Sequence, residues 1–92
     1  MDLFELLDSL YLELRGVKMR ALELYERVIP SIITKLKELN CELCRIYNRT
    51  KFNEIELVFK CESTCVYIKF EVEAMSIDVD KIRLTYSVGS CW

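Results

Sequence analysis

The spacing of apolar residues changes near residue 40, from a helical repeat before that point to a two-residue alternation after it. In the first part, apolar side chains recur at alternating steps of four and three residues, which lines one side of a helix. These residues are Leu3, Leu7, Leu10, Leu14, Val17, Ala21, Leu24 and Val28. Gly16 interrupts the stripe where a left-handed residue commonly ends a helix. The pattern predicts one helix over residues 2–15 and a second helix from Val17 to Leu39.

Pro30 lies inside the second predicted helix. Its ring collides with the preceding turn, and it has no backbone N–H to bond the carbonyl of Glu26. A complete break would need a good N-cap just before the proline, and Ile29 is a poor one. We therefore expect a kink at Pro30.

After Asn40 the alternation predicts four strands, over residues 41–47, 55–61, 66–72 and 82–88. The first is the weakest, because residues 41–47 also continue the helical stripe and would fit an extended second helix. Short links between strands favour antiparallel neighbours, and the helices are the available cover for the apolar face of the sheet. The expected fold is a single two-layer α+β domain over residues 1–92, with both helices packed on a four-stranded antiparallel meander.

Dimensions favour a homodimer. A helix from Val17 to Leu39 is about 35 Å long, whereas a four-stranded sheet is about 19 Å wide and about 27 Å along its strands. The overhanging apolar residues would need a second surface, and a two-fold dimer supplies one, through helices or through edge strands. A helix bent at Pro30 would instead wrap onto its own sheet.

Composition narrows the possible activities. The chain is 52% hydrophobic and 30% charged, a globular balance. It has no histidine, and we find no glycine-rich phosphate loop and no nucleophile beside a base, so we expect neither enzymatic activity nor a cofactor. We expect no membrane span, because no charge-free stretch approaches about 20 residues. Acidic residues near the start argue against a secretory signal and favour a cytoplasmic protein.

Residue usage suggests a habitat. Abundant Glu, Lys, Ile and Leu with no glutamine is typical of hyperthermophiles, whose intracellular proteins also tolerate disulfides. A hyperthermophilic archaeon, or one of its viruses acting in the host cytoplasm, would suit this composition.

Five cysteines allow two structural roles. The spacing Cys41-x2-Cys44-x16-Cys61-x3-Cys65 is close to a four-thiolate zinc pattern, but neither short turn contains glycine or proline. Strand parity instead places Cys65 and Cys91 together on the outward face, which predicts a disulfide between them. Cys44 and Cys61 share the core-facing parity and would bridge or pack as free thiols. Thiol chemistry at Cys41 or Cys44 is disfavoured because both follow a helix C-terminus.

Charged residues offer two binding surfaces. The outward strand positions include Glu54, Glu56, Glu71 and Glu73. Lys60 and Lys69 are their only expected counter-charges, which favours an acidic sheet face that docks on a basic protein. The second surface is a predicted hairpin that interleaves cations with an aromatic ring and would suit nucleic acid; its residues are Arg45, Tyr47, Arg49 and Lys51.

The leading functional hypothesis is a small, non-enzymatic, homodimeric protein-binding module that uses its acidic sheet face or an apolar helix surface. The alternative is a nucleic-acid-binding module that uses the basic hairpin at 45–52. A second alternative is a zinc-stabilised domain held by Cys41, Cys44, Cys61 and Cys65.

Overall fold

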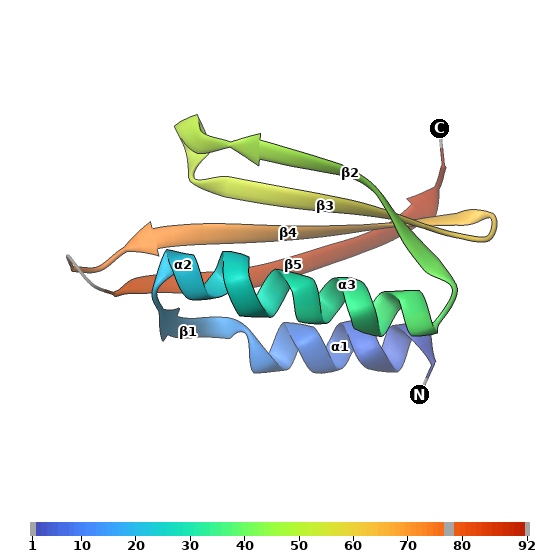
Figure 1. Ribbon diagram of the computed structural model, residues 1–92, viewed down its shortest axis with the longest axis horizontal. Helices are drawn as coiled ribbons and strands as arrows, with labels where there is room; N and C mark the ends of the chain where they lie inside the picture. Colours follow the sequence, from blue (N-terminus) through green and yellow to red (C-terminus); the bar gives the residue numbers. More distant parts are fainter. Residues whose placement is uncertain (1, 77–78, 92) are drawn as a thin grey trace.

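A computed structural model of the chain describes residues 2–76 and 79–91. It has two layers, helices on an antiparallel sheet, as the sequence predicts (Figure 1). The helical segments are α1 (Leu3–Glu13), α2 (Ala21–Glu23), the π-helical η1 (Leu24–Val28), α3 (Ile29–Glu38) and the 3-10 turn η2 (Thr50–Phe52). The strands are β1 (Arg15–Met19), β2 (Cys41–Arg49), β3 (Glu54–Cys61), β4 (Thr64–Ala74) and β5 (Asp80–Ser90). Their order in the sheet is β1-β5-β4-β3-β2.

The core lies between the helices and one face of the sheet. Leu7 of α1, Leu24 of η1 and Leu36 of α3 are fully buried there, together with Phe59 and Phe70 of the central strands. The opposite face of the sheet carries no helix (Figure 1). Within the described residues, no helix is long and apolar enough to cross a membrane.

The sheet has five strands, whereas the sequence predicts four. The additional strand, β1, occupies the segment predicted to begin the second helix, and Val17 lies opposite Ile82 of β5. The prediction was wrong because Val17 fits both patterns: it continues the helical stripe and also alternates with Met19 along a strand. Gly16, at φ 70°, forms a bulge in β1 between Arg15 and Val17.

The second helix begins at Ala21 and runs without a break to Glu38. In place of a simple kink at Pro30, the turn before the proline widens into the π-helical segment η1, where the N–H of Ile29 bonds the carbonyl of Leu24 five residues earlier. The wider turn accommodates a proline, which cannot take part in the usual bond four residues back.

The helix does not overhang the sheet. Its 18 residues from Ala21 to Glu38 span about 27 Å, whereas each of the 11-residue strands β4 and β5 extends about 37 Å. The geometric reason for expecting a homodimer is therefore absent.

Residues 41–47 belong to a strand and not to an extended helix. Asn40 takes the left-handed conformation at φ 61°, and its N–H bonds the carbonyl of Lys37, which ends α3. Strand β2 then follows at the edge of the sheet, and a bulge at Cys44 shifts its register between Leu43 and Arg45. Beyond the bulge β2 leaves the helical cover, so Ile46 is 56% exposed.

Candidate binding face of the sheet

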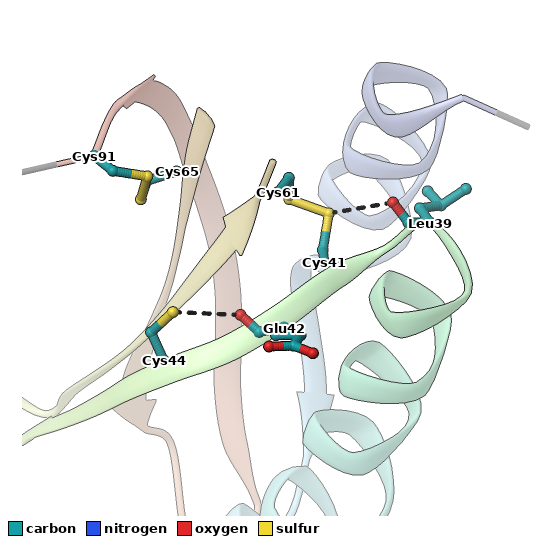
Figure 2. The surroundings of a disulfide bond; sticks show 7 residues. All are labelled: Leu39, Cys41, Glu42, Cys44, Cys61, Cys65 and Cys91. Carbon is teal, nitrogen blue, oxygen red and sulfur yellow. Dashed lines mark hydrogen bonds between the residues drawn. A yellow bond between two sulfur atoms is a disulfide. The ribbon is translucent and has the colours of Figure 1, made fainter. Parts of the chain in front are cut away.

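Two disulfides hold the sheet. Cys65 bonds Cys91, as strand parity predicts, and Cys41 bonds Cys61 (Figure 2). Cys41 and Cys61 lie directly opposite each other on β2 and β3, with their Cα atoms 4.2 Å apart. Cys44, expected to face the core, is exposed and free because the bulge turns it out of the alternation.

The four cysteines of the zinc pattern do not converge. Cys41 and Cys61 are joined on the core side of the sheet, whereas Cys65 is bonded to the C-terminal segment. The Cys44 thiol is turned toward the carbonyl of Glu42 (Figure 2). No group of three or more potential metal ligands occurs among the residues that the structure describes.

The face of the sheet away from the helices, here called the open face, carries most of the charged strand residues. Residues opposite each other in neighbouring strands share a face, so the register assigns its charged and aromatic members. They are Arg15, Lys18, Glu42, Arg45, Tyr47, Arg49, Glu54, Glu56, Lys60, Tyr67, Lys69, Glu71, Glu73, Lys81 and Arg83. This set holds eight cations against five carboxylates, an excess of three positive charges on a chain of net charge -2.

The expected acidic surface is therefore not continuous. Lys69 Nζ lies 3.9 Å from Glu54 and 3.6 Å from Glu71, and Arg49 lies 3.4 Å from Glu56.

Glu73, the fourth of these carboxylates, lies opposite Lys81 in the register. The sequence underestimates the cations because two of them, Arg15 and Lys18, come from β1, the strand that it does not predict. Lys81 and Arg83 lie at outward positions of the β5 alternation, so two further cations of the open face could have been predicted from the sequence.

Three of the four residues of the predicted basic hairpin come together on β2. Arg45 donates a hydrogen bond of 3.0 Å to the Tyr47 hydroxyl, and this bond raises the pKa of Arg45. The Arg49 guanidinium lies 5.4 Å from the centroid of the Tyr47 ring. Lys51 is separate from them, in the turn η2, with its amino group 5.9 Å from the ring of Phe52.

Tyr67 of β4 completes this part of the open face, and sequence reasoning missed it. Tyr67 lies opposite Val58, which in turn lies opposite Arg45. A depression of about 340 Å³ is lined by Arg45, Tyr47, Arg49, Glu56, Val58 and Tyr67. The register, which sequence patterns do not supply, is what brings Tyr67 beside the residues of β2.

The depression combines two aromatic rings, two guanidinium groups, one carboxylate and an apolar floor at Val58, which is 1% exposed. Rings can stack on planar ligands, guanidinium groups can bind phosphates, and the carboxylate can accept a hydrogen bond from an amino group. Comparison of the chain with protein-family models, curated proteins and solved structures found no match.

Proposed function

We propose that this protein binds single-stranded nucleic acid on the open face of its sheet. The observation that carries the proposal is the depression in which Tyr47 and Tyr67 share one face with Arg45 and Arg49. Aromatic rings that stack bases, placed between cations that neutralise phosphates, are what sequence-tolerant binding of single strands requires.

The charge distribution supports the same ligand. The open face has an excess of positive charge although the chain is acidic, so its cations are gathered on the side that the helices leave uncovered. A strand laid across the sheet would meet cations on every strand of it. The alternative, a basic protein docked on the four glutamates, is less favoured, because three of them form ion pairs with Lys69 or Arg49.

We further propose that the chain forms a homodimer through β2. This strand is at the edge of the sheet and is nine residues long. It exposes Ile46 on the helical face of the sheet, beyond the end of the helical cover. Pairing of two β2 strands about a two-fold axis would cover Ile46 and join the two open faces into one surface.

Titration of a fluorescently labelled mixed-sequence 12-nucleotide single strand, followed by anisotropy at low salt, tests nucleic-acid binding. Tyr47→Leu and Tyr67→Leu should each weaken binding by about tenfold or more, because each removes a stacking platform. Tyr25→Leu is the matched control, because Tyr25 is an exposed tyrosine of the helical layer.

Arg45→Gln should reduce the slope of log affinity against log salt concentration, because it removes a cation close to the phosphates. Arg27→Gln, in the helical layer, should leave the slope unchanged. The proposal would be abandoned if the wild-type protein does not bind, or if both tyrosine variants, shown to be folded, bind as tightly as the wild type.

A further inference from the structure

A second hollow lies at the opposite edge of the open face, where β1 pairs with β5. It has a volume of about 470 Å³ and is lined by Tyr11, Arg15, Gly16, Lys81, Arg83 and Thr85. Three of these six residues are cations, and none is a carboxylate. The hollow is separate from the depression on β2, β3 and β4.

The bulge at Gly16 shapes this hollow. A Cβ atom added at Gly16 would lie 3.0 Å from Cε of Lys81 and 3.9 Å from its Nζ. The lysine side chain therefore packs directly against the glycine backbone. Glu73 lies opposite Lys81 in the register, but the two form no ion pair. The glycine therefore brings the ammonium group of Lys81 close to the main chain.

The cations of the hollow repel one another. Arg15 lies directly opposite Arg83, and like charges in that position destabilise a sheet. In the described part of the chain, Arg15, Lys81 and Arg83 form no ion pair. The carboxylate opposite Arg83, Glu71, is in contact with Lys69 instead. Lys69, by contrast, forms ion pairs with two carboxylates, whereas these three cations of the hollow form none.

We propose that this hollow is a binding pocket for a phosphate group. A phosphate dianion would offset the repulsion between Arg15 and Arg83, and each guanidinium can bind two phosphate oxygens in a fork. Lys81 supplies a third cation, and the hydroxyls of Tyr11 and Thr85 supply neutral donors. The three cations and two hydroxyls line a single hollow, which distinguishes it from isolated lysines on a surface.

The phosphate could be free or could belong to a nucleic acid. The pocket lies one to two strands across the sheet from Tyr67 and four residues along it, because Tyr67 is opposite Ser87 and Arg15 is opposite Arg83. The separation is about 15 Å, so a strand stacked on the open face could place its 5′-phosphate there. This use of the pocket rests on the proposed function, whereas binding of inorganic phosphate does not.

Inorganic phosphate added to the ¹⁵N-labelled protein, with chloride at matched ionic strength as reference, tests the pocket by NMR. Saturable shifts should occur at the amides of Gly16 and Lys81, and Arg83→Gln should weaken phosphate binding by about tenfold. Arg27→Gln should bind phosphate as the wild type does. Without phosphate and at low salt, Arg83→Gln should melt no lower than the wild type, because it relieves the repulsion from Arg15. The proposed phosphate pocket would be refuted if chloride caused the same amide shifts, or if the shifts persisted unchanged in Arg83→Gln.

The source of the phosphate is tested with 5′-phosphorylated and 5′-hydroxyl oligonucleotides of one sequence. Tighter binding of the phosphorylated strand, lost in Arg83→Gln, supports a pocket for the end of a nucleic acid. Equal binding of the two strands together with saturable binding of inorganic phosphate supports a pocket for free phosphate. A protein that binds inorganic phosphate but no oligonucleotide refutes the proposed function and leaves the pocket intact.

Discussion

One hydrogen bond between side chains joins the two layers at Tyr86. Its hydroxyl, on β5, donates to the carboxylate of Asp8 on α1. This bond, with burial as a smaller contribution, raises the pKa of Tyr86 above its ordinary value. The folded chain therefore holds the phenolic proton at pH values where the unfolded chain has released it.

The free energy of unfolding should consequently fall at alkaline pH as Tyr86 loses its proton. The contribution of its hydrogen bond is complete below the unfolded pKa of about 10 and is lost as the pH rises through the higher folded value. Urea unfolding from pH 8 to pH 11 should show the wild type losing more free energy of unfolding than Tyr86→Phe. Tyr25→Phe, which removes an exposed hydroxyl, is the control. Parallel curves for the wild type and Tyr86→Phe would contradict the prediction.

At the residue scale, sequence patterns predict which face of the sheet a side chain lies on better than they predict which side chains it contacts. Alternation correctly directs Glu54 and Glu71 away from the core, since their strands have strong apolar faces. It does not predict that Lys69 lies between them, because that requires the register of β3 against β4. Because the register between strands is not known from sequence, Tyr67 was likewise not predicted as part of the candidate site.

At the scale of elements, the predictable segments are those whose pattern fits only one structure. Strands β3, β4 and β5 alternate strongly, and α1 carries an uninterrupted stripe. Strand β1 is ambiguous, because its five residues are too few to separate the two periods, and Val17 fits both. The π-helical turn η1 arises from a local conflict around Pro30 that hydrophobic periodicity does not register.

The Cys41–Cys61 disulfide should hold the edge strand β2 against β3. Replacing both residues by alanine should lower the free energy of unfolding by about 3 kcal/mol, because the unfolded chain gains the freedom of a loop with a sequence separation of 20. Cys44→Ala should change it little, because that thiol is free and exposed.

Urea unfolding without reductant measures both effects, and thiol titration of the denatured wild type should find one reactive cysteine in each chain. A loss below about 0.5 kcal/mol in the double variant would refute the stabilising role of the disulfide.

At the scale of the whole molecule, the two edges of the sheet differ. Both edge strands carry a bulge, but β1 is five residues long, whereas β2 is nine residues long and exposes Ile46. Short edge strands resist pairing with another chain, and longer ones with an exposed apolar residue invite it. An assembly built by strand pairing is therefore expected at β2.

Size-exclusion chromatography with light scattering tests this dimer. The wild type should have twice the mass of the 10.9 kDa chain. Ile46→Lys should be monomeric, because pairing near the middle of β2 would bring two lysines of the same face close together. Leu22→Lys alters a similarly exposed leucine of α2 and should remain a dimer. A monomeric wild type would exclude the dimer, and dissociation by Leu22→Lys alone would move the interface to the helices.

The position of β1 in the sheet has a consequence for how the chain is made. Residues 15–19 pair with residues 80–83, so β1 has no partner strand until β5 has left the ribosome. The hairpin of β2 and β3 joins residues close in sequence and can form much earlier. Strand β1 is therefore made before the other four strands but is the last to find its partner. Until then, the part of the β5 edge that it covers, residues 80–83, is open to other nascent chains.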